Sequence, residues 1–354
     1  MSEQEHSEKI VIAIDAMGGD FGPEAIIPAL DLVRQGRPDV SFLIFGDEEK
    51  IKPCLANYKS LERDSKIRHT DKMVKNDEKP STALRASKDT GMRLAIEAVK
   101  NGEAAAIVSA GNTGALMALS KMVMKTAPGV HRPAIASVMP GLAKDSVMLD
   151  LGANLIVDSE NLVQFAILGS VFAQAYNKME NIKPTVGLLN IGSEDMKGPE
   201  HIRGAAEILS RVDFPGEYYG FVEGDDITKG TVDVIVCDGY AGNVALKTAE
   251  GVGKYIKHHI NDAFTSNPFA MFGALFAYFS LRKLKRQTDP RLYNGGVFLG
   301  LNGICIKSHG GADALAFSYA VVKAVRLARL GYIEHVAQDI SHLTSQESFL
   351  SSDN

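Results

Sequence analysis

Short apolar runs alternate with amphipathic stretches along most of the chain. The runs are rich in Val, Ile and Leu, which is typical of strands buried on both faces, and the stretches between them have helical spacing. Predicted strands are Lys9–Ile14, Phe42–Phe45, Ala105–Val108, Val147–Leu149, Val186–Leu189 and Val232–Val236, and predicted helices are Pro23–Gln35, Thr82–Asn101, Gly114–Thr126, Ser159–Lys178, Glu200–Arg211 and Gly242–Ala263. This alternation predicts a three-layer α/β/α fold on a mostly parallel sheet.

The pattern continues without an internal repeat or a low-complexity linker, so 9–331 is predicted to be one large α/β domain. A last helix is predicted at Asp313–Leu330, with Gly331 as its C-cap. A segment at about 255–287 interrupts the alternation and is predicted to be a helical projection. The polar ends, 1–8 and 332–354, are predicted to be frayed.

Gly, Asn and Asp recur where each predicted strand ends. The strand ends read IDAMGGD, FGD, VSAGNTG, LDLGAN, LNIGSED and VCDGYAGN. One such turn is explained by turn chemistry, because Gly and Asn tolerate a positive φ and Asp caps helices. Six of them favour a polar-ligand cleft, because open parallel sheets bind ligands outside the carboxyl ends of their strands.

Composition excludes several classes of protein. The net charge of −5 argues against general nucleic-acid binding, which needs a dominant basic face. The three cysteines are scattered without CxxC spacing, so neither a disulfide framework nor a zinc site is indicated. The acidic, polar start is unlike a signal peptide, and we expect a cytoplasmic protein.

Two turns have the geometry of an anion site, although no GxGxxG or GxxxxGK[ST] motif occurs. SAGNTGAL and DGYAGNVALKT each follow a strand and open a helix, whose first N–H groups are free to bind an anion. Asn112 and Thr113 would add side-chain donors in the first turn. Asn243 would lie at the cleft in the second, with Lys247 one helical turn further on. Tight strand–helix turns without a ligand remain the alternative interpretation.

The motif NIGSEDMKGPE brings further polar groups to the end of another predicted strand. It contains Asn190 and Lys197, and the motif DLGAN places Asp150 and Asn154 nearby. Lys197 offers a positive charge for a phosphate or for a developing oxyanion. A solvated charged loop is the alternative interpretation of the same residues.

Two residues with nucleophile or base chemistry are better explained by structure. Cys237 ends a predicted strand with no paired His to lower its pKa, which favours an inert buried thiol. His309 in KSHGG is a loop histidine with no evident partner. No Ser–His–Asp constellation can be assembled from the sequence.

Seven motifs in order give the chain a family resemblance. IDAMGGDFGP, KPSTALRASKDTGM, SAGNTGAL, DLGAN, LLNIGSEDMKG, DGYAGNVALKT and FLGLNGICIKSHG resemble the PlsX family of phosphate acyltransferases, from about Lys9 to Gly331. The resemblance implies synthesis of acyl-phosphate from acyl carrier protein thioesters and phosphate. It also implies a fold like that of isopropylmalate dehydrogenase and phosphotransacetylase, and a homodimer. Met196 departs from the family pattern, where many relatives have a second basic residue.

For that reaction we expect direct attack, because phosphate is already a competent nucleophile and a thioester is an activated acyl donor; no covalent nucleophile, metal or cofactor is then needed. Lys197 and Asn243 are then the catalytic residues, which stabilise the oxyanion of the transition state. The substrate-binding residues are Asn112 and Thr113 for phosphate, and Asp15, Asn154, Asn190 and Lys247 for shaping the site.

Two other functions stay open at this point. The same fold hosts metal- and NAD-dependent decarboxylating dehydrogenases, for which Asp225, Asp226 and Asp238 are conceivable ligands. No arginine cluster for a dicarboxylate stands near them in the sequence. A non-enzymatic, membrane-docked scaffold for acyl carrier protein is the third possibility, and it would leave the polar strand ends without a purpose.

An apolar segment followed by a basic cluster suggests a contact with a surface. Asn267–Gln287 contains too few apolar residues to span a bilayer, and as one helix it would carry a phenylalanine stripe. Such a helix lies in a membrane interface, meets acyl carrier protein, or packs in the dimer. We expect peripheral association with the inner face of the cell membrane, where a membrane-bound glycerol-3-phosphate acyltransferase would use the product. The residues concerned are Phe269, Phe272, Phe276, Phe279, Arg282, Lys283, Lys285 and Arg286.

Overall fold

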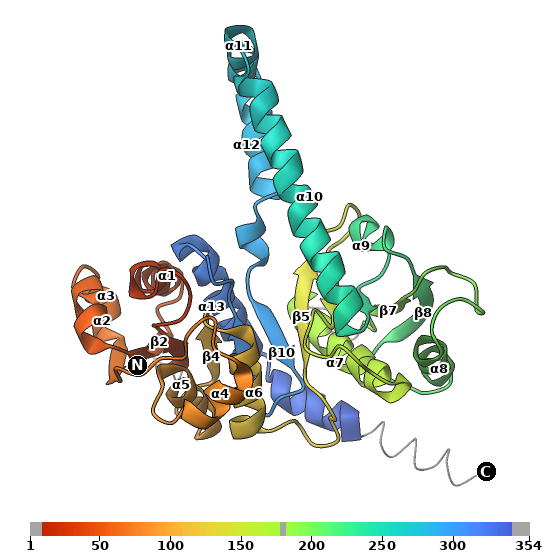
Figure 1. The fold of residues 1–354 in the computed structure, drawn as a ribbon, viewed down its shortest axis with the longest axis horizontal. Helices are drawn as coiled ribbons and strands as arrows, with labels where there is room; N and C mark the ends of the chain where they lie inside the picture. The colour runs from red at the N-terminus through yellow and green to blue at the C-terminus, as the bar shows by residue number, and fades with distance from the viewer. Residues whose placement is uncertain (1–8, 178–181, 342–354) are drawn as a thin grey trace, which may run out of the picture.

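A computed structural model of the protein describes residues 9–177 and 182–341, and one sheet of 11 strands runs through it (Figure 1). The strand order is β3-β2-β1-β4-β11-β10-β5-β6-β9-β7-β8. The strands are β1 Ile10–Asp15, β2 Val40–Gly46, β3 Ser65–His69, β4 Ala106–Ser109, β5 Ala134–Met139, β6 Ser146–Leu149, β7 Thr185–Leu189, β8 Glu217–Val222, β9 Val234–Val236, β10 Gly296–Leu299 and β11 Ile304–Lys307.

The sheet contains two parallel sets of strands that run in opposite directions. β3, β2, β1, β4 and β11 form the first set, and β6, β9, β7 and β8 form the second. β10 and β5 lie between the sets, each antiparallel to its neighbours. The mostly parallel α/β sheet predicted from the sequence is therefore confirmed. The polar strand ends, however, form two groups and not a single row.

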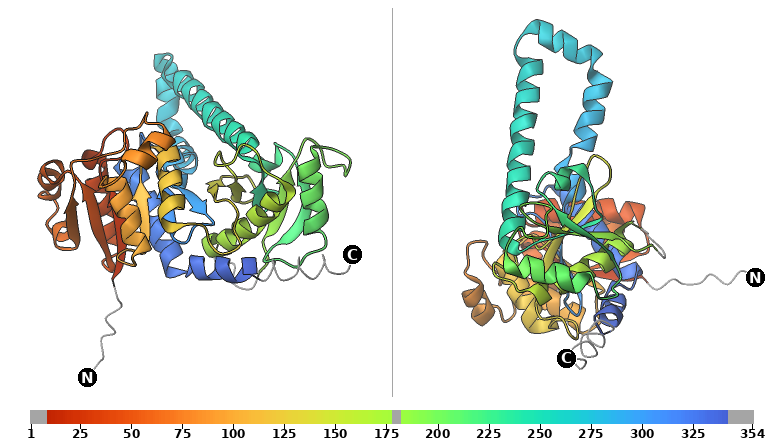
Figure 2. Two further views of the ribbon diagram at one scale, coloured as in Figure 1. Left: turned by 60° about the horizontal axis from the view of Figure 1, so that its bottom comes forward. Right: turned by 90° about the vertical axis from the view of Figure 1, so that its right-hand side faces the viewer.

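Helices cover both faces of the sheet, which gives the three layers (Figure 2). In β1, Ile12 and Ile14 pack in one core with α1, α13 and α7, while Ala13 packs in a second core with α5 and α6. The helices are α1 Pro23–Gly36, α2 Glu48–Leu55, α3 Lys59–Arg63, α4 Pro80–Ala86, α5 Gly91–Lys100, α6 Thr113–Met124, α7 Ser159–Asn177, α8 Glu200–Leu209, α9 Asp226–Lys229, α10 Gly239–Thr265, α11 Pro268–Phe276, α12 Tyr278–Gln287 and α13 Ala314–Arg329, with a 3-10 turn at Pro290–Tyr293.

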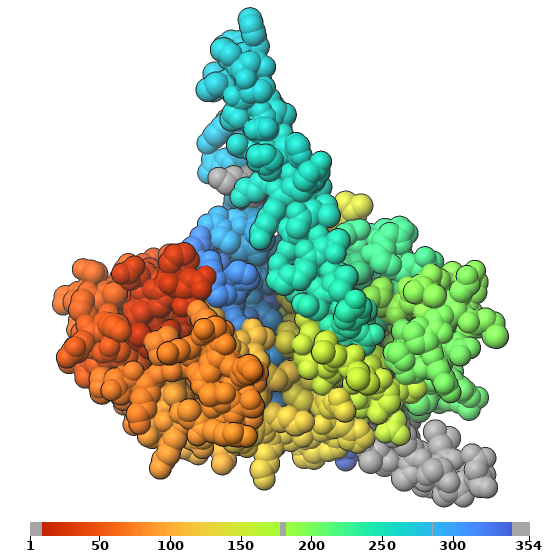
Figure 3. Space-filling view, viewed as in Figure 1, coloured from red at the N-terminus to blue at the C-terminus, as the bar shows by residue number. Residues whose placement is uncertain are grey.

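The first and second sets of strands belong to two lobes. In the space-filling view a hollow separates the red and orange lobe from the yellow and green one, and C-terminal segments coloured blue lie at its floor (Figure 3). The antiparallel strands β10 and β5 therefore connect two bodies that each carry one group of polar strand ends.

Two helical predictions need correction. The expected helix Thr82–Asn101 is interrupted, because Asp89 has a φ of 68° and the Thr90 side chain caps a new helix, α5. The expected fraying from residue 332 is wrong for 332–341, which form a helix that buries Tyr332 and Ile340. Residues 1–8 and 342–354 lie outside the described part of the chain.

The projecting segment is a helical hairpin that stands clear of both lobes (Figures 1 and 2). α10 forms its outgoing arm, and α11 and α12 form its tip and returning arm. The single helix expected over Asn267–Gln287 is wrong, because α11 and α12 are separated at Ala277. None of the helices in the described residues has the length and apolar character needed to cross a membrane.

Candidate active site

The loop after β6 is organised around a buried carboxylate. Asp150 is inaccessible to solvent and accepts hydrogen bonds from the N–H groups of Ile135 (2.9 Å), Ala153 (3.0 Å) and Asn154 (2.6 Å). Burial raises the pKa of Asp150, and these hydrogen bonds act in the opposite direction. The Asn154 amide donates to Asp150 and to the Pro133 carbonyl, so its role here is to hold the loop.

The start of α10 packs directly on this loop. Asp238 caps the helix by accepting a hydrogen bond from the Ala241 N–H (2.8 Å). A Cβ atom on Gly242 would lie 1.9 Å from the Asp150 carbonyl oxygen, so only glycine allows this approach. A Cβ on Gly152 would lie 3.5 Å from that of Asn243, which places Asn243 beside the loop. Within the described residues the exposed Asn243 amide has no hydrogen-bond partner.

Lys197 lies on a loop that Asn190 closes. The Asn190 side chain donates to the Lys197 carbonyl (3.1 Å) and accepts from the Ile191 N–H (2.9 Å). The Lys197 side chain is exposed, and no ion pair or hydrogen bond to its ammonium is seen among residues 9–177 and 182–341. β7 and β9 are adjacent parallel strands, so the loop after β7, which carries Lys197, and the start of α10 after β9, which carries Asn243, lie at the same end of the sheet. Both residues are therefore free to bind a ligand.

Lys247 behaves differently from these two residues. It is exposed on α10, one helical turn beyond Asn243, and its ammonium pairs with Glu250 at 2.8 Å. A ligand would have to compete with this ion pair, which at an exposed position is weak.

The first set of strands ends in a row of three polar residues. Asp15 of β1, Ser109 of β4 and Lys307 of β11 are paired in register on adjacent parallel strands. The Ser109 hydroxyl donates to the Asp15 carboxylate (2.7 Å) and accepts from the Gly111 N–H (3.0 Å). Burial raises the pKa of Asp15. Lys307 was not identified from the sequence, since β11 was not predicted, and Ser109, although it opens the motif SAGNTGAL, was not proposed as a site residue.

Asn112 is the N-cap of α6, and its side chain is already committed. Its oxygen accepts from the Ala115 N–H (2.9 Å), and its amide donates to the carbonyls of Asn76 (2.8 Å) and Glu78 (2.9 Å). Thr113 follows as the first residue of the helix and is exposed. Asn112 therefore joins α6 to the loop before α4, and this leaves backbone N–H groups and Thr113 to face a ligand.

The structural interpretation of Cys237 is confirmed. Its side chain is buried, with 2% of its surface exposed. Burial raises the pKa of the thiol well above its ordinary value, and the nearby carboxylates of Asp150 and Asp238 raise it further. A thiol in this state is a poor nucleophile. His309 is exposed, and its Nδ1 accepts from the Gly311 N–H within its own loop (3.0 Å).

The conceivable metal ligands have other partners. Asp225 pairs with Lys229, and Asp226 accepts hydrogen bonds from Glu223 and Thr231, while Asp238 caps α10. The described residues contain no group of three or more His, Cys, Asp or Glu side chains arranged to hold a metal ion. The donor set of a metal-dependent dehydrogenase does not form around these carboxylates.

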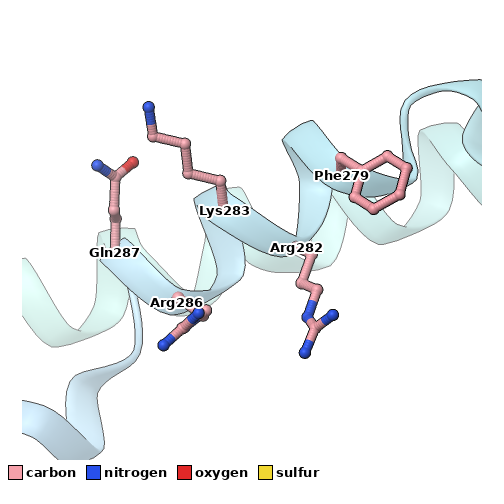
Figure 4. A pocket seen from close by; sticks show the side chains of 5 residues that line it. All are labelled: Phe279, Arg282, Lys283, Arg286 and Gln287. Atoms are coloured by element: carbon pink, nitrogen blue, oxygen red, sulfur yellow. The ribbon is translucent and has the colours of Figure 1, made fainter.

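The hairpin tip exposes the predicted phenylalanine stripe. Phe269, Phe272, Phe276 and Phe279 are 88%, 62%, 76% and 78% exposed. On α12, Phe279 and the basic side chains line an open hollow of about 460 Å³ (Figure 4). The side chain of Lys285 lies outside the described part of the structure. The residues that line the hollow are Phe279, Arg282, Lys283, Arg286 and Gln287.

Two solved phosphotransacetylases have the same fold. A phosphotransacetylase from Streptococcus pyogenes superimposes with a TM-score of 0.63 at 16% identity, covering 92% of this chain and 95% of that one. The EutD phosphotransacetylase from Staphylococcus aureus gives a TM-score of 0.58 at 15% identity, covering 91% and 94%. The predicted phosphotransacetylase-like fold is confirmed.

Sequence relatives are much closer. A phosphate acyltransferase from Rhodospirillum centenum is 50% identical over 337 residues, which cover 95% of this chain and 94% of the relative. One from Rhodospirillum rubrum is 49% identical and covers 95% of each. The family model described as "Fatty acid synthesis protein" matches residues 10–335. The chain therefore belongs to this family, the PlsX family of phosphate acyltransferases that its motifs resemble, and it is an acyltransferase of lipid biosynthesis.

Proposed function

We propose that this enzyme transfers a fatty acyl group from acyl carrier protein to inorganic phosphate and releases acyl-phosphate for the synthesis of phosphatidic acid. The observation that carries the proposal is 50% identity to a phosphate acyltransferase over 95% of the chain. The acyl carrier protein donor comes from the resemblance of the seven motifs. The dehydrogenase alternative loses its support, because its expected carboxylate ligands are engaged elsewhere.

Direct attack accounts for the chemistry without an acyl-enzyme. An oxygen of hydrogen phosphate forms a bond to the thioester carbon, the C–S bond breaks, and the proton of the phosphate ends on the departing sulfur. The carbonyl oxygen becomes an oxyanion in the transition state, which hydrogen-bond donors and cations stabilise. The free amide of Asn243 and the free ammonium of Lys197 suit this role. The buried Cys237 thiol supports a mechanism without a cysteine nucleophile.

Product analysis tests this function. Purified protein is mixed with acyl carrier protein thioester and phosphate, and the products are identified by mass. We expect acyl-phosphate and free carrier thiol, formed only when phosphate is present and with undiminished rate in a chelator. Full consumption of the thioester without phosphate would contradict the proposal. Nicotinamide reduction with a 2-hydroxy acid and magnesium would instead support the dehydrogenase.

The Cys237→Ser variant is expected to keep at least about half of the wild-type turnover. A buried thiol with a raised pKa supplies little thiolate, and serine is nearly isosteric. Steady-state turnover and circular dichroism of the variant are the measurements. Loss of turnover in a folded variant would show that the acyl group passes through Cys237.

A second copy of the chain is the proposed partner of α10. Val244, Val252, Tyr255 and Ile256 are each between 50% and 65% exposed along this helix. Exposed apolar side chains in a row mark an interaction surface, and homodimers with two-fold symmetry are the commonest assemblies. The homodimer implied by the family resemblance would cover this face.

The hairpin tip is the proposed contact with the membrane surface. Its four phenylalanines are largely exposed, and the basic side chains of α12 follow at once. An apolar face beside basic residues suits an interface with anionic lipids, and the same cations would attract acidic acyl carrier protein. Docking there would deliver the product to a membrane-bound glycerol-3-phosphate acyltransferase.

The double variant Phe272→Glu/Phe276→Glu is expected to lose binding to anionic phosphatidylglycerol vesicles. The two rings lie 5.1 Å apart and are exposed, so the substitutions remove apolar area and add repulsion without disturbing a core. Vesicle co-sedimentation at low and high salt is the measurement, and salt should weaken wild-type binding.

Leu142→Glu is the matched control, since Leu142 is 92% exposed but lies on the loop beside α9, away from the tip. It should bind vesicles like the wild type. If the double variant instead dissociates the dimer in sedimentation equilibrium, the stripe is a dimer contact and the membrane proposal fails.

A further inference from the structure

Lys307 lies in the first lobe, and its ammonium has no carboxylate partner in the described part of the protein. Its ammonium donates to the carbonyl oxygen of Ala110 (3.0 Å) and to that of Ser308. Within residues 9–177 and 182–341 no carboxylate lies within 4.0 Å of it. Lys307 is half-buried, and both groups that its ammonium contacts are neutral carbonyls, so its charge has no close counter-ion among these residues. Two of its three N–H groups are used, so one remains for a ligand.

The nearest carboxylates do not serve as that counter-ion. Asp15 is buried, and its carboxyl group is bound by the Ser109 hydroxyl and the Met17 N–H. Asp20 is exposed on the next loop, where the Asn76 amide approaches it at 3.5 Å. Both act on Lys307 only through longer-range attraction.

The loops around Lys307 pack closely against one another. A Cβ on Gly18 would lie 2.6 Å from the Gly111 nitrogen, and one on Gly19 would lie 2.8 Å from the Gly310 oxygen. The loops after β1, β4 and β11 therefore meet where α6 begins. The N-terminus of α6 adds the positive end of its dipole to the charge of Lys307. Asn112 cannot provide the anion contact, because its amide is committed to the loop before α4.

We propose that Lys307 binds the phosphate oxyanion of the acyl acceptor, at the ends of β1, β4 and β11. The inference rests on the proposed function and deepens it, because it separates phosphate binding in the first lobe from oxyanion stabilisation by Asn243 and Lys197 in the second. The alternative is a structural lysine that only ties the loops of Ala110 and Ser308 together.

The charge state of Lys307 gives the proposal a pH signature. Burial lowers the pKa of Lys307 to about 8, and the attraction of the Asp15 and Asp20 carboxylates opposes this only in part. The pKa of the Cys305 thiol is raised to about 12 by burial, so this group stays neutral, and His309 is held in its own loop. As pH rises through about 8, the free enzyme loses the cation, and kcat/KM for phosphate should fall.

Kinetics of two substitutions test the assignment. Lys307→Met is expected to raise the KM for phosphate about 10- to 100-fold, the range of one charge-assisted hydrogen bond, while the KM for the acyl donor stays unchanged. Lys307→Arg should recover most of the affinity and remove the decline above pH 8. Titration calorimetry with inorganic phosphate gives the same comparison without turnover.

Lys323→Met is a matched control. Lys323 is more deeply buried than Lys307, its ammonium also donates to a carbonyl, that of Gly295 (2.6 Å), and burial also lowers its pKa to about 8. It extends from α13 to the residue before Gly296, which is paired with Lys307, so it tests the loss of a buried lysine beside the same strand end. Its removal should leave the KM for phosphate unchanged.

Three results would overturn the proposal. One is an unchanged KM for phosphate in folded Lys307→Met. Another is a rise in the KM for phosphate in Lys323→Met that equals the rise in Lys307→Met. The third is a rise in the KM of the acyl donor alone, which would assign Lys307 to the phosphodiester of the carrier's arm. If Lys307→Met does not fold, phosphate binding to the wild-type protein is measured as a function of pH. Weaker binding above about pH 8 supports the proposal, and unchanged binding contradicts it. The two proposals can be told apart. If the wild-type protein binds phosphate through Lys307 but does not transfer acyl groups, the proposed function is contradicted and the phosphate site is still supported.

Discussion

The Asn243→Ala variant is expected to turn over about 10²–10³ times more slowly than the wild-type protein, and Lys197→Ala to lose as much. In the proposed mechanism, each substitution removes one group that stabilises the oxyanion of the transition state. Both side chains are exposed and make no hydrogen bond or ion pair within the described residues, so nothing in the fold depends on them. The melting temperature should therefore move by no more than about 1–2 °C.

Turnover at saturating phosphate and thioester, with thermal unfolding of each variant, is the measurement. Asn261→Ala is the control for Asn243→Ala, because Asn261 is an exposed asparagine on the same helix, α10. It should retain wild-type turnover. Full activity in Asn243→Ala would remove this residue from the mechanism, and a large drop in melting temperature would show a structural role instead.

Gly242→Ala is expected to lower the free energy of unfolding by at least about 3 kcal/mol and to abolish activity. The new Cβ would lie 1.9 Å from the Asp150 carbonyl oxygen, a backbone atom, so α10 and the loop after β6 must move apart. That movement displaces Asn243 from the loop. Chemical denaturation measured by circular dichroism gives the change in unfolding free energy.

Gly36→Ala provides the contrast. Gly36 is the last residue of α1, and a Cβ there would have no atom within 4 Å. Alanine in that open helical position should stabilise the protein by a few tenths to about 1 kcal/mol. Equal stability of Gly242→Ala and the wild-type protein would mean that the close approach of α10 is not required.

Much of the fold could be predicted because long buried strands and amphipathic helices have distinct periods. β3, β5, β8, β10 and β11 were missed; the last two are short and lie among glycines, which weakens the strand pattern. Their absence from the prediction hid the strand-end position of Lys307. The opposite directions of the two parallel sets could not be foreseen either, because an apolar run does not encode the direction of its strand in the sheet.

For the candidate site, the motifs placed polar residues at strand ends but did not show which contacts each side chain makes. Asn112 and Asn154 look like ligand donors in the sequence, yet their amides hold backbone carbonyls in place. Asn243 and Lys197 come from equally polar loops and remain free. An asparagine at a turn can bind a ligand or hold the backbone of a neighbouring loop. The position of the surrounding backbone groups decides which of the two roles it has.

α10 is one uninterrupted helix, so its length sets the distance between the candidate site and the hairpin tip. The helix starts at the capping residue of the candidate site and continues for 27 residues to the hairpin tip. At 1.5 Å per residue it is a rigid spacer of about 40 Å. If the tip rests on a bilayer, α10 holds the reaction centre off the lipid by up to this length. A gap of that height is about the width of a small domain, so a carrier protein can deliver its thioester sideways while the enzyme stays attached.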